Sequence, residues 1–170
     1  MSDFDSALRK EILISQFNRV HVSMRDFKEA TDYLRAFNRY RSALMRRALL
    51  LSAIISYARP FTAHNNAPKN RGASSRLPIK IQQALSADEL LQHSRLIGLR
   101  NEALAHSEIS RKPTSYLMGT GNGFLVKSAP FDVLTESIDH ELFVRGCLNL
   151  IRCCEFKLFE LNDEIAKVCQ

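Results

Sequence analysis

Apolar residues recur at intervals of three and four along most of the chain, which is the spacing of one helix face. The pattern predicts a first helix over Asp5–Val20 and a second over Met24–Phe37. A third, over about Arg39–Arg59, is apolar on most of its circumference and should lie centrally in a bundle. Pro60 should end this helix, because proline lacks an amide donor and disfavours helix in the preceding residue.

The second half of the chain carries signals for two more helices. Ser86-Ala87-Asp88-Glu89 is a capping box, in which a serine hydroxyl and a glutamate carboxylate satisfy reciprocal backbone donors. It predicts a fourth helix that continues to about Ser107. The last and longest helix is expected over about Thr135–Val168. Between these two helices, Tyr116–Met118 and Phe124–Val126 flank a glycine-rich run, a pattern that favours a short β-hairpin.

These elements predict an all-α fold, an up-and-down bundle of about five helices with a small β-hairpin inserted before the last one. A length of 170 residues is typical of one domain, so residues 1–170 are interpreted as a single helical domain. The segment Phe61–Leu85, rich in Asn, Ser and Pro, predicts a long irregular connection. Such a connection could fold over an anionic ligand or form a disordered surface segment.

The last predicted helix carries an apolar seam with alternating spacings of four and three, as in coiled coils. Its members are Cys147, Ile151, Cys154, Leu158, Leu161, Ile165 and Val168. Phe156 and Phe159 lie off this seam and need a second surface, provided either by another helix of the chain or by a second subunit.

Composition excludes several classes of protein. Hydrophobic residues make up 45% and charged residues 25%, which is typical of globular proteins. No apolar run approaches the roughly 20 residues that span a bilayer, so no membrane partner is expected. The four cysteines crowd into the last 24 residues, which favours a reducing cytoplasm over a secreted disulfide framework. They show no zinc-type spacing with the histidines, so neither a metal nor a cofactor is predicted.

Charge is distributed unevenly along the chain. There are 24 Lys and Arg against 18 Asp and Glu, a formal net charge of +6. The stretch Tyr33–Ala87 contains no acidic residue and ten basic ones, eight of them arginine. Such a surface favours an anionic partner, because guanidinium groups bind phosphate in planar pairs. Alternatively, the acidic C-terminal helix supplies the counter-charges and the basic face is merely solvated.

One candidate for chemistry lies near the end of the fourth predicted helix. Arg100 and Asn101 are followed by His106, six positions after the arginine, in the run Arg-Asn-Glu-Ala-Leu-Ala-His. The run resembles the Arg-x(4–6)-His signature of HEPN domains, in particular abortive-infection-type members in which an Arg-Asn or Arg-Asp pair precedes Leu-Ala-His. Glu108 stands where relatives regulated by a nucleotidyltransferase carry Tyr, so that arrangement is not expected here.

The resemblance implies a homodimeric endoribonuclease that cleaves RNA without a metal, with motif residues of two subunits meeting across a cleft. Carried over position by position, Arg100 and His106 are the catalytic pair and Asn101 supports them. A histidine can remove the proton of a ribose 2′-hydroxyl, and an arginine can stabilise the charged phosphorane. The expected products carry a 2′,3′-cyclic phosphate and a 5′-hydroxyl. A cytoplasmic toxin or phage-defence effector, with a protein antitoxin as a partner, is the class of protein that the resemblance favours.

Residues expected to bind the RNA lie in the acid-free basic stretch. They are Arg46, Arg47, Arg59, Lys69, Arg71 and Arg76.

The motif also has a structural interpretation. Residues six apart on a helix lie ~120° apart around its axis, so either Arg100 wraps around to reach His106 or a second subunit completes the site. If the motif is structural, His106 binds the last carbonyls of the helix and Arg100 pairs with a nearby carboxylate. The chain would then be a non-catalytic helical module that binds RNA or a protein through its basic surface.

Overall fold

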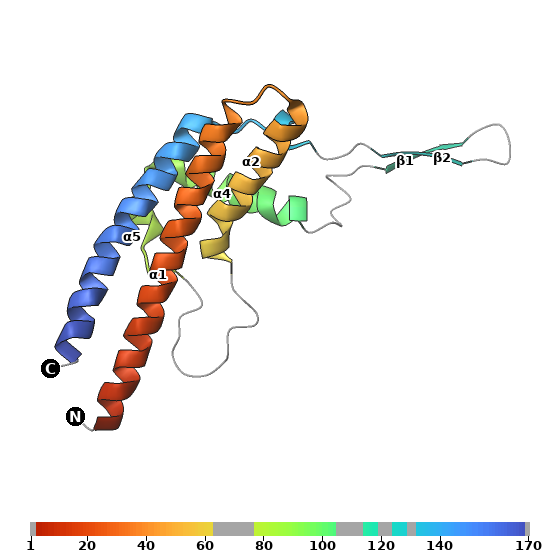
Figure 1. The fold of residues 1–170 in the computed structure, drawn as a ribbon. Helices are drawn as coiled ribbons and strands as arrows, with labels where there is room; N and C mark the ends of the chain where they lie inside the picture. The colour runs from red at the N-terminus through yellow and green to blue at the C-terminus, as the bar shows by residue number, and fades with distance from the viewer. Residues whose placement is uncertain (1–2, 63–76, 105–113, 119–123, 129–131, 169–170) are drawn as a thin grey trace.

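The two longest helices, α1 (Asp3–Phe37) and α5 (His140–Val168), run antiparallel and pack along each other, so that both chain termini lie at one end of the molecule (Figure 1). The computed structural model describes residues 3–62, 77–104, 114–118, 124–128 and 132–168. Shorter helices α2 (Ala43–Ala58) and α4 (Ala87–Leu104) complete the bundle, with α2 against α1 and α4 against both α2 and α5. The predicted all-α class is confirmed.

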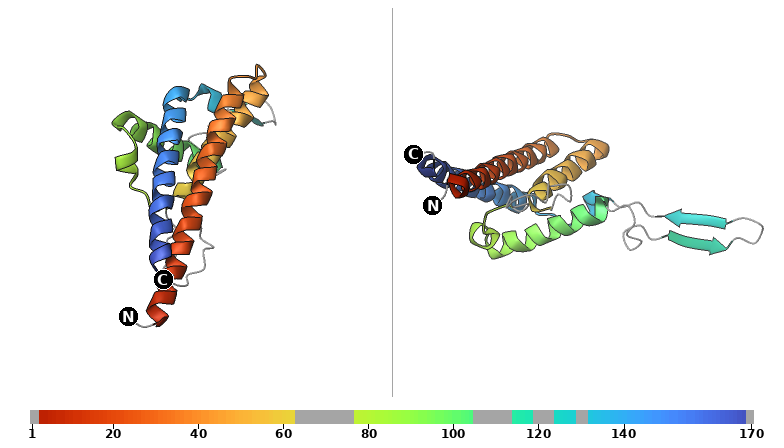
Figure 2. Two further views of the ribbon diagram at one scale, coloured as in Figure 1. Left: turned by 60° about the vertical axis from the view of Figure 1, so that its left-hand side comes forward. Right: turned by 90° about the horizontal axis from the view of Figure 1, so that it is seen from below.

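Helix α4 departs from the up-and-down arrangement. It runs across α2 and α5, whereas α1, α2 and α5 run along the length of the bundle (Figure 1 and the right view of Figure 2). Neighbouring helices are held antiparallel by short loops, and the connection from α2 to α4 is long. Such a long connection does not fix the direction of α4. The helix instead follows the packing of its buried face, which includes Leu96 and Leu99.

Helix α1 corrects the prediction of two helices, Asp5–Val20 and Met24–Phe37, because it is continuous. Neither Gly nor Pro interrupts the residues between the two predicted helices. Ser23 is buried within α1, and its hydroxyl donates to the Arg19 carbonyl one turn earlier, a bond that a helix accommodates. The apolar stripe thus passes through this region unbroken.

Helix ends agree with the local signals of the sequence where those signals are specific. The α-helix that precedes Pro60 ends at Ala58, and Pro60 lies in the 3₁₀ turn η1 (Arg59–Phe61). Helix α2 begins at Ala43, later than the expected Arg39, and α5 begins at His140 because the Asp139 carboxylate accepts the Leu142 amide.

The capping box of α4 forms as predicted and continues into a larger network. The Ser86 amide donates to the Glu89 carboxylate over 2.8 Å, and the Glu89 amide donates to the Ser86 hydroxyl over 3.3 Å. The same carboxylate accepts Arg145 Nε at 3.0 Å and Asn149 Nδ2 at 3.1 Å, both from α5. Burial opposes ionisation of Glu89, but these hydrogen bonds outweigh it and lower the pKa of its carboxyl.

Two shorter elements lie between the long helices. The predicted irregular connection contains α3 (Ile81–Ala84) near its end, and η3 (Val133–Thr135) precedes α5. Strands β1 (Thr114–Met118) and β2 (Phe124–Ser128) pair antiparallel, with Tyr116 opposite Val126. The two segments read as β-like from the sequence fall within these strands, and the glycine-rich turn between them lies outside the described residues.

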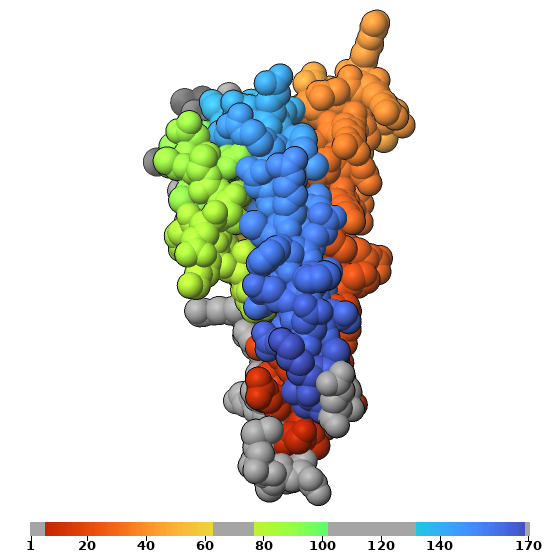
Figure 3. Space-filling model, turned by 90° about the vertical axis from the view of Figure 1, so that its left-hand side faces the viewer, coloured from red at the N-terminus to blue at the C-terminus, as the bar shows by residue number. Residues whose placement is uncertain are grey.

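The core is aromatic where α1, α2 and α5 meet. The ring of Tyr57 packs on Phe27, Phe61 and Phe143 with centroid separations between 5.1 and 5.8 Å. Further along α5, the predicted seam is buried: Cys147, Ile151, Cys154 and Leu161 belong to the core, and Leu158, Ile165 and Val168 pack against it. Figure 3 shows α5 between α4 and α1, with the last part of α5 and the start of α1 extending beyond α4.

The phenylalanines off the seam, for which the sequence predicted a second covering surface, are exposed. Phe156 is 67% and Phe159 is 68% accessible, so the elements that the structure describes leave them uncovered. No helix in the described part of the chain is both long enough and apolar enough to cross a membrane.

The aromatic core makes a measurable contribution to stability. Phe27→Ala should lower the free energy of unfolding by about 3–5 kcal/mol, because the ring is fully buried and its loss leaves a cavity. Leu91→Ala, at a helical position that is 75% exposed, is the control and should change it by less than about 0.5 kcal/mol. Urea unfolding followed by circular dichroism measures both values. Similar losses for the two variants would contradict the assignment of Phe27 to the core.

Candidate nucleic-acid interface

The predicted catalytic arginine lies in the last described turn of α4. Arg100 Nη1 donates to Asn101 Oδ1 over 3.0 Å, and Asn101 is exposed. Arg100 has no carboxylate partner among the residues that the structure describes. Arg95, one turn earlier, binds the Glu136 carboxylate at 3.2 Å. The structural alternative expected a carboxylate beside Arg100, and an amide oxygen is found there instead.

The rest of the motif and part of the predicted RNA-binding set lie outside the described residues. These are His106, Lys69, Arg71 and Arg76. The pairing of Arg100 with His106 therefore stays a prediction.

Arg59 is held by acidic residues of α1. Its guanidinium contacts the Asp26 carboxylate at 2.7 Å and the Glu29 carboxylate at 3.1 Å, and it donates to the Ser56 hydroxyl at 2.9 Å. Ser56 in turn donates to Glu29 over 2.8 Å. Burial raises the pKa of Asp26 even though Arg59 acts in the opposite direction. The network joins α1 to the end of α2, so Arg59, predicted to bind RNA, has a structural role here.

Arg47 is held in the same way, at the other end of α2. Its Nε and Nη2 bind the two oxygens of Asp132 at 3.0 and 2.7 Å, a bidentate pair. Asp132 also accepts the Leu134 amide and so caps η3. Hydrogen bonds from Arg47 and from this amide lower the pKa of Asp132 to about 2. The pair fastens the segment before α5 to α2.

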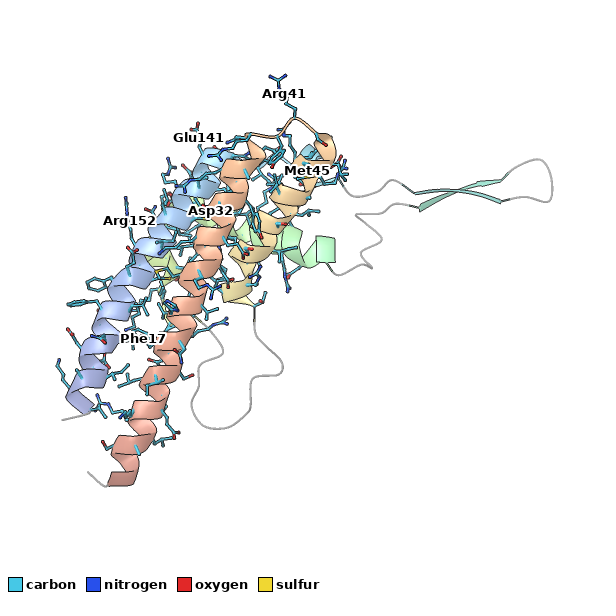
Figure 4. All side chains as sticks on the ribbon, viewed as in Figure 1. Phe17, Asp32, Arg41, Met45, Glu141 and Arg152 are labelled. Atoms are coloured by element: carbon cyan, nitrogen blue, oxygen red, sulfur yellow. The ribbon has the colours of Figure 1, made fainter. Side chains whose placement is uncertain are left out.

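These contacts change the interpretation of the acid-free stretch. The carboxylates that bind Arg47 and Arg59 belong to α1 and to the turn before α5, not to the acidic C-terminal helix as the solvated-face alternative assumed. Arg39, Arg41 and Arg46 remain exposed and have no carboxylate partner within the described ranges. Figure 4 shows Arg41 at the turn between α1 and α2, directed away from the bundle.

A half-buried histidine was missed by the sequence analysis. His93 on α4 shares a hydrogen bond of 3.0 Å between its Nδ1 and the Tyr57 hydroxyl, and its ring packs edge-on against Phe61. Burial lowers the pKa of His93, so its imidazole is neutral at pH 7. It borders a pocket of about 430 Å³ whose walls include Ile79, Ile97 and Gln82. The sequence pattern that could have identified His93 is its spacing of three residues from Leu90 and from Leu96. This spacing places it on the apolar side of the helix.

The described cysteines are free thiols that behave as small apolar groups. Burial raises the pKa of Cys147 and Cys154 to about 12, so both are protonated at neutral pH. Among the described residues, no three His, Cys, Asp or Glu side chains come close enough to hold a metal ion.

Comparison with models of protein families, with curated proteins and with solved structures found no match. The HEPN resemblance therefore rests on the motif of α4 and on the helical setting.

The Arg47–Asp132 pair predicts a pH dependence of stability. The pKa of Asp132 is depressed in the folded state, so its stabilising effect is present above its ordinary value of about 4. The effect should be lost as the pH falls from about 4 to about 2. Asp132→Asn should lower Tm at pH 7 and reduce the slope of Tm against pH in that window. Asp163→Asn, at an exposed residue of α5, is the control. Equal slopes for wild type and Asp132→Asn would refute the role of the pair.

Proposed function

We propose that this chain is a metal-independent endoribonuclease of the HEPN type that acts as a homodimer, in the role of a toxin or phage-defence effector. The observation that carries the proposal is the state of Arg100. Its guanidinium stands at the end of α4 beside an amide oxygen, with no carboxylate partner in the described part of the chain.

The charge of Arg100 matters because phosphate must compete for it. The arginines at positions 47, 59, 95 and 145 each hold a carboxylate within 3.2 Å, so an RNA phosphate would have to displace an anion to bind them. An amide oxygen carries no net charge. The bond to Asn101 therefore orients the guanidinium of Arg100 and leaves its positive charge for a phosphate. This makes Asn101 a positioning residue in the proposal.

The chemistry follows from the two side chains. His106 takes the proton of a ribose 2′-hydroxyl, and the 2′ oxygen attacks the adjacent phosphorus. The bond from phosphorus to the 5′ oxygen breaks, and that oxygen leaves as a hydroxyl after taking a proton from water, while His106 returns its own proton to solvent. Arg100 stabilises the charge that builds on the phosphorane oxygens. The products are a 2′,3′-cyclic phosphate and a 5′-hydroxyl.

A second copy of the chain is part of the proposal, because a regular helix that continued from Arg100 to His106 would set the two side chains ~120° apart around its axis. A dimer that joins the two motifs must bring the ends of both α4 helices together. The last part of α5, which carries Phe156 and Phe159, lies on the opposite side of the molecule from the end of α4 in Figure 1. Contact through those phenylalanines alone would leave the motifs apart, so a dimer that shares its sites uses the α4 end.

The alternative is a non-catalytic helical module that binds RNA or a protein. The exposed arginines of the α1–α2 turn favour it independently of Arg100, since they hold cationic charge on the surface with no carboxylate partner in the described ranges. This alternative predicts salt-sensitive RNA binding without cleavage.

Substitution of the motif tests the nuclease. His106→Ala should reduce RNA cleavage by about 10²–10⁴-fold and Arg100→Ala by about 10²–10³-fold. Arg95→Ala removes a cation from the same helix and should retain activity within a few-fold. Gel analysis of a labelled RNA, with and without EDTA, measures the rates and identifies the cyclic-phosphate ends. Cleavage by His106→Ala at the wild-type rate would show that the site is assigned wrongly.

Mixing of inactive subunits tests whether the site is shared. Arg100→Ala and His106→Ala are each expected to be inactive, and unfolding and refolding them together allows mixed dimers to form. Roughly a quarter of wild-type activity should return, since about half the dimers are mixed and each contains one complete site. No recovery, with mixed dimers demonstrated by affinity tags, would mean that each chain completes its own site.

A further inference from the structure

The turn between α1 and α2 carries an exposed basic surface separate from the α4 motif. We propose that this surface, formed by Arg39, Tyr40, Arg41 and Arg46 and called the basic tip below, binds single-stranded RNA. The inference rests on RNA being the substrate in the proposed function, and it adds a place where the strand docks.

The basic tip is exposed over an unusual length of chain. All nine residues from Asn38 to Arg46 are solvent-exposed, and they span the end of α1, the turn and the first residues of α2. Two of them are large and apolar: Leu44 is 70% and Met45 is 40% accessible. The first buried residue of α2 is Leu50. The first residues of α2, from Ala43 to Met45, therefore lie exposed beyond the buried core.

The positive charge of the basic tip is not neutralised by the acids around it. Asp32, the nearest acid before it in sequence, is bound by Arg35 at 3.3 Å, and Asp132 is occupied by Arg47. Glu141 lines a pocket that also contains Asn38, so it is a neighbouring acid. Asp139 is a second one, because its charge acts on His140, whose ring packs on Phe37. Two carboxylates against the three arginines leave this described part of the surface cationic.

One of the three arginines is already positioned. The guanidinium of Arg46 lies 4.3 Å from the ring centroid of Phe37, a cation–π contact, and the ring of His140 packs on the same phenylalanine. Phe37 is buried, so Arg46 is held against a rigid surface. Arg39 and Arg41 make no side-chain hydrogen bond or ion pair within the described ranges, so both can turn toward a ligand. The arrangement combines a fixed cation with two adaptable ones.

The chemistry of these side chains matches a single strand of RNA. Arginine binds phosphate oxygens in planar pairs and also stacks on bases, whereas lysine supplies charge alone. Tyr40, between two arginines and 48% accessible, offers a ring on which a base can stack. Bases are accessible to such a ring in single strands and are hidden in A-form duplexes. An anionic membrane would also attract the positive charge. Membrane binding does not require guanidinium planes around an aromatic ring, whereas binding of phosphates and bases uses both.

The experiment measures binding of a fluorescent single-stranded 12-mer RNA by anisotropy at several salt concentrations. All proteins carry His106→Ala to prevent cleavage. The double variant Arg39→Gln/Arg41→Gln is compared with Arg9→Gln/Arg25→Gln, which removes two exposed arginines from α1. Two lost phosphate contacts should reduce the slope of log Kd against log salt by about 1.4, and Kd should rise about tenfold or more. The control should keep the slope within about 0.5.

Tyr40→Ala separates stacking from charge. Its Kd should rise roughly 5- to 100-fold while the salt slope stays unchanged, because stacking involves no counterion release. Thermal melts check that each variant is folded.

The outcomes separate this inference from the proposed function. Cleavage by the protein with an intact His106, together with an unchanged salt slope for Arg39→Gln/Arg41→Gln, would overturn the basic tip alone. The inference is also overturned if that double variant loses binding to phosphatidylglycerol vesicles and retains RNA binding. A protein that neither binds nor cleaves RNA overturns both proposals. RNA binding through the tip without cleavage supports the tip and rejects the nuclease.

Discussion

The packing of α1 along α5 is the contact on which the rest of the structure depends. An isolated helix is marginally stable in water, and the apolar stripe of α1 is stabilised only when another apolar face covers it. The seam of α5 provides that face, from Cys147 to Leu161. Helices α2 and α4 then close the bundle around part of this pair, which explains why the aromatic core lies beside α2 and the two long helices extend past α4.

A second constraint acts on the charged residues. A carboxylate withdrawn from water must gain ionic or hydrogen-bonding partners, and Asp26 and Glu89 do so by binding an arginine from another element. Asp132, which is partly exposed, likewise binds an arginine of another element. These pairs join α1 to α2, α4 to α5, and the turn before α5 to α2. They also sort the arginines into those used for the fold and those whose charge stays available on the surface. The interpretation of function therefore depends on which arginines the carboxylates bind.

The available cations lie in two places with different geometry. Arg100 stands at the end of α4 with its orientation set by Asn101, as a reacting group needs. The basic tip is an exposed surface at the α1–α2 turn, with Arg41 directed away from the bundle, which suits binding of a flexible strand. The proposed enzyme thus separates holding the RNA from cutting it, and the half-buried His93, hydrogen-bonded to Tyr57, takes part in neither.

Local signals in the sequence predicted much of the fold and little of the interface. The capping box at Ser86, the helix end before Pro60 and the α5 seam all depend on neighbouring residues, and all three formed. The break expected after Val20 was wrong, because a short polar interruption cannot stop a helix whose apolar stripe continues beyond it. The RNA-binding arginines were harder to predict from the sequence. Arg46, Arg47 and Arg59 look alike in sequence, but two of them meet acids that are 33 and 85 positions away.

The sequence by itself determined the helical class, the placement of the seam and the presence of an acid-free basic stretch, because these are properties of residues near one another in the chain. Only the tertiary structure decided which cations are neutralised and which remain exposed. The physical reason is that a salt bridge acts over a few ångströms, and the packing of α1, α2 and the turn before α5 sets which opposite charges come that close.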